Sequence, residues 1–118
     1  MVELGTSLGI TSLYLAKNEG CLVTTFEGSH ALANVALSNF EYFDKENIEL
    51  IEGDLNSTLP EFLQNPTKIN FVLMDAHHRY EPTLHYFNLL MRRLNEKSIV
   101  ILDAKHFIMK ILTVVNCL

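Results

Sequence analysis

Short apolar runs rich in valine, isoleucine and leucine alternate along the chain with longer segments in which apolar residues recur every three or four positions. This alternation is typical of βα units, in which helices connect the strands of a parallel sheet. Strands are expected at residues 2–4, 22–26, 48–51, 69–74 and 98–102. The pattern therefore predicts an α/β fold with a doubly wound, mainly parallel sheet of about five strands and helices on both faces.

Four helices fit between these strands. The first is expected over residues 10–17, with Gly20 in the left-handed conformation of a C-cap. The second begins after Ser29 and the short third after Ser57, two residues that favour the N-cap position, and the fourth opens at Glu81-Pro82. The apolar positions expected to face the core are Ala33, Ala36, Leu37 and Phe40 in the second helix and Leu84, Phe87, Leu90, Met91 and Leu94 in the fourth.

Each predicted strand carries an acidic residue at or just beyond its carboxyl end. These residues are Glu3, Glu27, Asp54, Asp75 and Asp103. In an open parallel sheet, ligands bind at this edge, near the point where the strand order reverses. One such carboxylate would most simply be solvated or cap a helix, but five in register predict that at least three line one ligand site.

The glycine-rich segment Gly5-Thr6-Ser7-Leu8-Gly9 connects the first strand to the first helix. Glycine lets the backbone approach a ligand closely, and a helix that begins near Ile10 directs free N–H groups at an anionic group. The segment also matches the Gly-x-Ser-x-Gly elbow of α/β-hydrolases, with Ser7 as nucleophile and Asp75 or Asp103 with His106 as its partners. A nicotinamide-binding turn would need Gly-x-Gly-x-x-Gly, from which the sequence departs at Ser7 and Ile10.

The order of these features resembles that in class I S-adenosylmethionine-dependent methyltransferases, which have a Rossmann-like fold. The segment from Glu3 to Gly9 resembles their acidic-x-Gly-x-Gly-x-Gly signature, with Ser7 in place of the middle glycine. Phe26-Glu27-Gly28 resembles their second motif and Glu52-Gly53-Asp54 their third. The resemblance covers residues 2–106 and is closest to the small-molecule O-methyltransferase branch that includes catechol O-methyltransferase.

The resemblance implies S-adenosyl-L-methionine (SAM) as the cofactor and methyl transfer to a small-molecule hydroxyl by in-line displacement. Glu27 would accept both ribose hydroxyls, because the two oxygens of a carboxylate match a vicinal diol. Asp54 and the backbone of Leu55 would face the adenine amino group, Thr11 the methionine carboxylate and Asp75 the cationic sulfonium. The other implied cofactor-binding residues are Glu3, Gly5, Thr6, Ser7, Gly9 and Gly28. A non-catalytic module that binds SAM without turnover is the alternative.

The segment from Asp75 to Tyr80 contains two adjacent histidines and is the candidate for substrate chemistry. His78 or His106 is predicted to act as a base towards a hydroxyl acceptor, although each histidine of the pair is equally well explained as a polar loop residue. Metal-dependent members of the resembled branch carry an Asp-Asn or Asp-Asp pair at the fifth strand. Here the pair is Asp103-Ala104, so no metal site is predicted.

The composition and charge of the chain limit the kinds of partner that it can bind. A formal charge of −5 over 118 residues argues against a broad nucleic-acid interface. No apolar stretch approaches the roughly 20 residues that span a bilayer, and no signal segment precedes the first strand, so we expect a cytoplasmic protein without a membrane partner. Cys21 and Cys117 lack the spacing of a metal site and are expected to be reduced thiols.

We expect one domain over residues 1–118, with a core at 2–106 and an apolar tail at 107–118. A complete fold of the resembled family has seven strands, so the expected sheet is incomplete and the chain is predicted to be truncated at both ends. The tail fits either a sixth strand beside the fifth or a helix laid over it. An uncovered fifth strand would invite pairing with another chain, which predicts a homodimer through that edge or through the tail.

Overall fold

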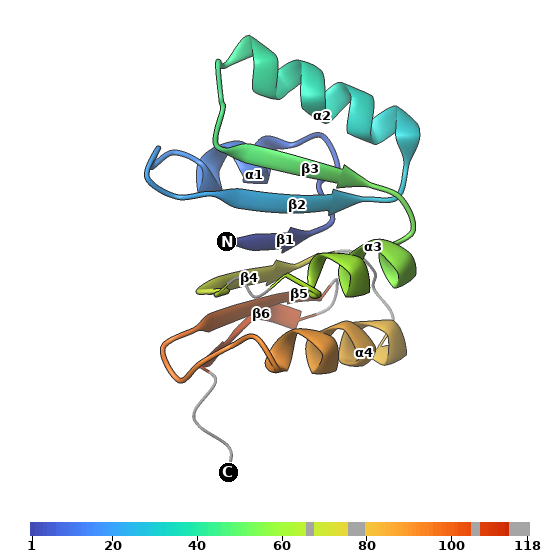
Figure 1. The fold of residues 1–118 in the computed structure, drawn as a ribbon, viewed down its shortest axis with the longest axis vertical. Helices are drawn as coiled ribbons and strands as arrows, with labels where there is room; N and C mark the ends of the chain where they lie inside the picture. The colour runs from blue at the N-terminus through green and yellow to red at the C-terminus, as the bar shows by residue number, and fades with distance from the viewer. Residues whose placement is uncertain (66–67, 76–79, 105–106, 114–118) are drawn as a thin grey trace.

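The computed structural model describes residues 1–65, 68–75, 80–104 and 107–113, with only the backbone described for 80–83, 103–104 and 107–113. Six strands form one sheet in the order β3-β2-β1-β4-β5-β6 (Figure 1). The strands are β1 (Val2–Leu4), β2 (Val23–Glu27), β3 (Ile48–Glu52), β4 (Phe71–Met74), β5 (Ile99–Ala104) and β6 (Phe107–Thr113). The first five are parallel, and β6 is antiparallel to β5. The predicted doubly wound sheet is confirmed.

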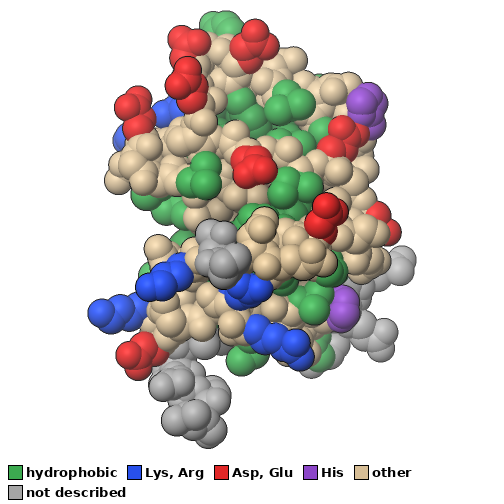
Figure 2. Space-filling model, in the orientation of Figure 1, with side chains coloured by type: hydrophobic (Ala, Val, Ile, Leu, Met, Phe, Trp, Pro, Cys, Tyr) green, Lys and Arg blue, Asp and Glu red, His purple; other side chains and the backbone are tan. Residues whose placement is uncertain are grey.

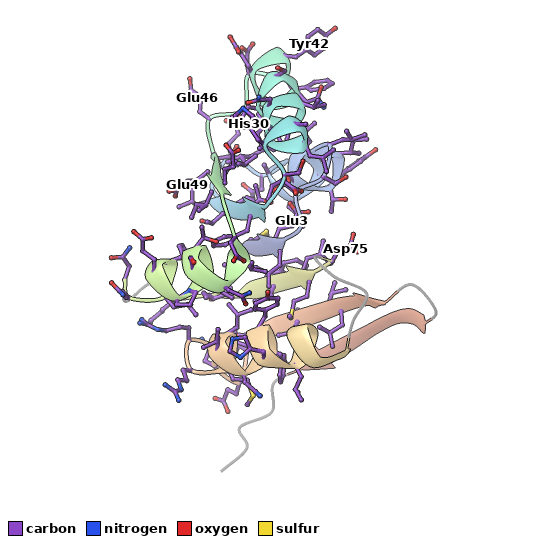
Figure 3. The ribbon with its side chains drawn as sticks, turned by 90° about the vertical axis from the view of Figure 1, so that its right-hand side faces the viewer. Glu3, His30, Tyr42, Glu46, Glu49 and Asp75 are labelled. Atoms are coloured by element: carbon purple, nitrogen blue, oxygen red, sulfur yellow. The ribbon has the colours of Figure 1, made fainter. Side chains whose placement is uncertain are left out.

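The strand order reverses at β1, which pairs with β2 on one side and β4 on the other. Helices α1 (Ile10–Leu15) and α2 (His30–Tyr42) lie on one face of the sheet, and α3 (Leu55–Phe62) and α4 (Tyr80–Met91) on the other (Figures 1 and 3). The core between the sheet and α3 and α4 is apolar. Its buried members include Val2, Leu4, Phe26, Leu55, Leu59, Val72, Leu90 and Val100.

Two helix ends differ from the prediction. Helix α1 ends at Leu15, and Gly20 is absent from the residues with positive φ, so it is not a left-handed C-cap. Helix α3 is capped by Asp54, whose side chain accepts a hydrogen bond from the Asn56 N–H, and Ser57 lies inside the helix. Ser29 is the N-cap of α2 as predicted, because its hydroxyl accepts from the Leu32 N–H at 3.3 Å.

The predicted core positions are confirmed for Ala33, Ala36, Phe40 and Leu90, which are buried. Three others are wrong, because the side chains of Leu37, Leu84 and Met91 are exposed. Each of these residues either follows a buried residue in the helix or lies at the edge of its apolar stripe. Because successive side chains on a helix are rotated by about 100°, such positions face solvent.

The apolar tail is a strand over Phe107–Thr113 and covers the free edge of β5. Of the two structures that fitted this segment, the sixth strand is therefore the correct one. Among the described residues, no helix has the length and apolar character needed to cross a bilayer.

Candidate functional site

A cavity of about 570 Å³ lies at the carboxyl ends of the strands, where the turns after β1, β2 and β3 meet Asp75 at the end of β4. This volume is in the range of small-molecule and cofactor sites. We call it the rim cavity, and it is lined by Gly5, Ser7, Phe26, Glu27, Gly28, Ser29, Leu32, Gly53, Asp54, Leu55 and Asp75. It occupies the position at which an open parallel sheet binds ligands, beside the reversal of strand order at β1.

The turn after β1 is fixed to β2 by its backbone. The N–H groups of Gly5 and Thr6 both donate to the Phe26 carbonyl, at 2.9 and 3.0 Å. Gly5 has φ 105° and Ser7 φ 54°, so the turn passes through conformations that glycine adopts easily and serine rarely. The turn thus presents main chain, rather than bulky side chains, to the rim cavity.

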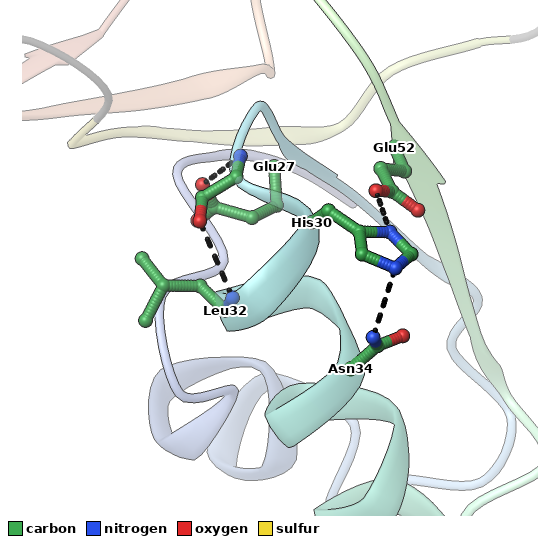
Figure 4. A network of polar contacts seen from close by, with 6 residues as sticks. Glu27, His30, Leu32, Asn34 and Glu52 are labelled. Carbon is green, nitrogen blue, oxygen red and sulfur yellow. Dashed lines mark hydrogen bonds and ion pairs between the residues drawn. The ribbon is translucent and has the colours of Figure 1, made fainter.

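Glu27 joins two of the turns through its carboxylate. Its Oε1 accepts from the Ser7 N–H at 2.7 Å, and its Oε2 accepts from the Ser29 N–H at 3.0 Å. Figure 4 shows Glu27 next to the first turn of α2, where Leu32 donates to Ser29. Each carboxylate oxygen can accept more than one hydrogen bond, so both remain able to accept from a ligand. The carboxylate is therefore held in a fixed orientation with acceptor capacity to spare.

The turn after β3 also lines the rim cavity, through Gly53, Asp54 and Leu55. Gly53 has φ 139°, and its N–H donates to the Glu27 carbonyl at 3.0 Å, which ties this turn to the one after β2. Asp54 accepts from the Asn56 N–H through Oδ1 at 3.0 Å. Asp54 therefore caps α3 and lines the rim cavity at the same time.

The rim cavity is acidic. Of the described residues that line it, three carry carboxylates and none is a lysine or an arginine. The basic side chains of Lys68, Arg92 and Lys97 come before β4, after α4 and before β5, at the opposite end of the sheet. In Figure 2, most of the lysine and arginine side chains in view lie in the lower half of the molecule, and most of the acidic ones lie in the upper half. This distribution favours a ligand with positive charge in the cavity.

Seven of the predicted cofactor-binding residues line the rim cavity and four do not. Gly5, Ser7, Glu27, Gly28, Asp54, Leu55 and Asp75 line it. Thr11 is exposed on α1, Thr6 is buried with its hydroxyl 2.7 Å from that of Thr25, and Glu3 lies beneath the turn. At Gly9 a Cβ atom would lie 2.6 Å from the Phe40 ring, so packing against α2 already requires a glycine at this position.

Glu3 is 1% exposed and carries a carboxylate on the face of the sheet that α1 covers. Its Oε1 accepts from the Ser12 hydroxyl and, at 2.7 Å, from the Thr25 hydroxyl. Burial raises the pKa of the Glu3 carboxyl, the two hydrogen bonds oppose this rise, and the negative charge of Asp75 adds to it. Figure 3 shows Glu3 on β1 and Asp75 directly after the neighbouring strand β4.

Replacing Glu3 with glutamine is expected to raise the free energy of unfolding of the ligand-free protein at neutral pH. A raised pKa in the folded state gives stability that is present below the ordinary glutamate pKa and is lost as the pH rises through the folded-state value. Glutamine keeps an acceptor oxygen for Ser12 and Thr25 but never acquires the charge. Urea denaturation should show the largest gain at neutral pH and a smaller one at acid pH; a wild type more stable than the variant at neutral pH would contradict this.

The predicted bases His78 and His106 lie outside the described residues, as does the side chain of Asp103. His30 is exposed beside the rim, where its Nδ1 is 2.5 Å from Glu52 and its Nε2 is 3.1 Å from the Asn34 amide (Figure 4). No group of three His, Cys, Asp or Glu side chains within the described part of the chain is arranged to hold a metal ion.

Four residues that line the rim cavity were not among the predicted site residues: Phe26, Ser29, Leu32 and Gly53. Phe26 and Gly53 lie within the second and third motif segments and Ser29 directly follows the second, so their position at the strand ends was the available signal. A smaller hollow of about 280 Å³ at the amino ends of the strands is lined by Cys21, Lys68 and Phe71 among others, and none of its lining residues is acidic.

Comparisons with known proteins agree with this geometry. The model of a family described as "Methyltransferase domain" matches residues 2–104. An O-methyltransferase from Bacillus cereus, solved in complex with SAH, is 25% identical with a TM-score of 0.77, over 86% of this chain and 47% of that one. The O-methyltransferase TomG from Streptomyces achromogenes, solved in complex with SAM, is 23% identical with a TM-score of 0.77, over 86% and 47%. The chain thus spans about half the length of these structures, and a search of curated proteins found no match.

Proposed function

Because the chain belongs to the methyltransferase-domain family, we propose that its rim cavity binds SAM and that the protein transfers the cofactor's methyl group to a hydroxyl of a small molecule. The two similar O-methyltransferases, one solved with SAH and one with SAM, support this choice of cofactor and reaction. Neither the family match nor these structures favour a hydrolase with Ser7 as nucleophile or a nicotinamide-binding protein.

The observation that carries the proposal is the orientation of Glu27. Two backbone N–H groups from two different turns hold its carboxylate in place at the wall of the rim cavity. A carboxylate held in this way can accept from two adjacent hydroxyls, as the ribose of an adenosine ligand presents them. The residues present therefore fit the cofactor.

The other lining residues divide the cavity into ends with different chemistry. Asp54 and the backbone of Leu55, at the start of α3, would face the adenine amino group. Gly5 and Ser7 offer main chain for close packing against the methionine part, and Asp75 offers negative charge beside the sulfonium. Thr11, which is exposed on α1, remains the proposed partner of the methionine carboxylate.

When bound, the cofactor supplies a sulfonium whose methyl carbon is already a strong electrophile. The protein then has to hold the acceptor in line with the breaking bond and keep water out. A hydroxyl acceptor must lose its proton, and His78 or His106 is the proposed base for this step. The absence of an acidic or amide side chain after Asp103 is the reason for proposing chemistry without a metal.

Calorimetric titration of the full chain with SAM and SAH tests the proposal. We expect both to bind with 1:1 stoichiometry, and no heat of binding at millimolar ligand would refute the cofactor assignment. If both bind, a screen of hydroxylated acceptors with SAM separates an active enzyme from a module that binds the cofactor without turnover.

We also propose that the protein acts in the cytoplasm, on a small-molecule acceptor and without nucleic-acid or membrane partners. A homodimer remains part of the proposal. Because β6 covers the edge of β5, such a dimer would pair through the outer edge of β6 rather than through β5 itself. Sedimentation of a stable monomer at micromolar concentration would exclude it.

A further inference from the structure

The register of the three central strands places Glu3 directly below the rim. Glu3 is level with Thr25 on β2 and with Leu73 on β4. Side chains alternate along a strand, so residues two positions further on share the same face. The next row towards the rim therefore consists of Glu27, Gly5 and Asp75.

Gly5 is the middle member of that row and has no side chain. No side chain at position 5 therefore separates the Glu3 row from the rim, and the hydroxyl of the next residue, Thr6, lies 2.7 Å from that of Thr25. Two steps along a strand span about 6–7 Å, so the Glu3 row lies about that far below the rim. A charge at this depth is poorly screened by solvent, because Glu3 is 1% exposed.

The surroundings of Glu3 allow it to ionise although it is buried. Two hydroxyl donors, Ser12 from α1 and Thr25 from β2, point at the same carboxylate oxygen. From β4 the group that acts on it is Asp75, whose charge opposes ionisation, and among the described residues no other charged group shifts its titration. A cation in the rim cavity would offset the repulsion between Glu3 and Asp75.

From this arrangement, and given the proposed function, we propose that Glu3 determines specificity for charge. Together with Asp75, it makes the rim cavity prefer the cationic cofactor SAM to SAH, its neutral demethylated product. SAM and SAH share the adenosine and amino-acid parts, so their contacts with Glu27 and Asp54 cancel in the ratio of the two dissociation constants. The positive charge of the sulfonium is then the difference that determines this ratio. The preference helps the product to leave once the methyl group has been transferred.

The test measures the dissociation constants of SAM and SAH by calorimetry over a pH series from below the ordinary pKa of glutamate to above neutrality. At the alkaline end, the wild type should prefer SAM over SAH about tenfold more strongly than Glu3→Gln does. At the acid end, where Glu3 is protonated, the two proteins should show the same ratio. Glu49→Gln is the matched control, because it removes an exposed carboxylate in the middle of β3, and its ratio should equal that of the wild type.

A second variant tests the role of the Glu3 charge without removing the carboxylate. Ser12→Ala retains the carboxylate but removes one donor to it, so the rise in preference for SAM should move to higher pH. The inference would be overturned if Glu3→Gln weakened the binding of SAM and SAH equally. It would also be overturned if Ser12→Ala left unchanged the pH at which the preference for SAM rises. Either result would leave the cofactor site in place. A wild type that binds neither ligand would refute the proposed function itself.

Discussion

Replacing Glu27 with alanine is expected to weaken the binding of SAM about 100-fold, which corresponds to about 3 kcal/mol. The loss has two sources. The ligand hydroxyls lose a charged acceptor, and the N–H groups of Ser7 and Ser29 lose the carboxylate that holds both turns in place. Ser7 has φ 54°, so its turn depends on this stabilisation. Calorimetric titration of the variant measures the change directly.

Two further variants separate these sources. Glu27→Gln keeps one oxygen acceptor and should bind with an affinity between those of the wild type and the alanine variant. Glu49→Ala removes an exposed carboxylate from the neighbouring strand and should bind like the wild type. An alanine variant at position 27 that keeps wild-type affinity would remove the central support for an adenosine site.

Replacing Gly9 with alanine is expected to lower the free energy of unfolding by about 3 kcal/mol. Gly9 has φ 85°, and a Cβ atom there would lie 2.6 Å from the Phe40 ring and 3.1 Å from the Cβ of Ala36. Both the backbone conformation and the contact between the turn and α2 therefore exclude a side chain. Urea denaturation monitored by far-UV circular dichroism gives the magnitude.

Gly20→Ala is the matched control, since Gly20 lacks a positive φ and a Cβ atom would come no closer than 3.3 Å to Asn18 Oδ1. It should change the stability little. Phe40→Leu should cost less in the Gly9→Ala background than alone, because the smaller side chain relieves the overlap. Additive effects of the two substitutions would show that the ring contact is not the cause.

The sheet could be predicted from the sequence because each strand is a compact apolar run that ends at a polar residue. Burial on both faces makes such runs recognisable in parallel sheets, and the observed strands begin or end within two residues of the expected positions. The ends of the helices were harder to predict from the sequence. Asp54 and Ser57 are both good caps, three residues apart, and the choice between them depends on the path of the chain out of β3.

The site was predictable where strand ends determine it and less so where tertiary packing does. Glu27, Asp54 and Asp75 follow from their strands, and all three line the rim cavity. The reason for Gly9 depends on Phe40, which is distant in sequence and adjacent only after α2 has packed. The fixed orientation of Glu27 likewise depends on N–H groups whose directions are set by two turns, and no sequence pattern encodes these directions.

The central strand β1 joins two parts of the sheet through three residue pairs on each side. The walls of the rim cavity come from both parts, with Glu27 and Asp54 on one side of this seam and Asp75 on the other. A ligand that spans the cavity would contact both parts of the sheet. Its binding free energy would then add to that of the few backbone pairs that join the two parts through β1. Because the Gly5 and Thr6 N–H groups also tie the turn after β1 to β2, the ligand-free protein should open first between β1 and β4. Occupancy of the cavity should make the two parts unfold as one cooperative unit.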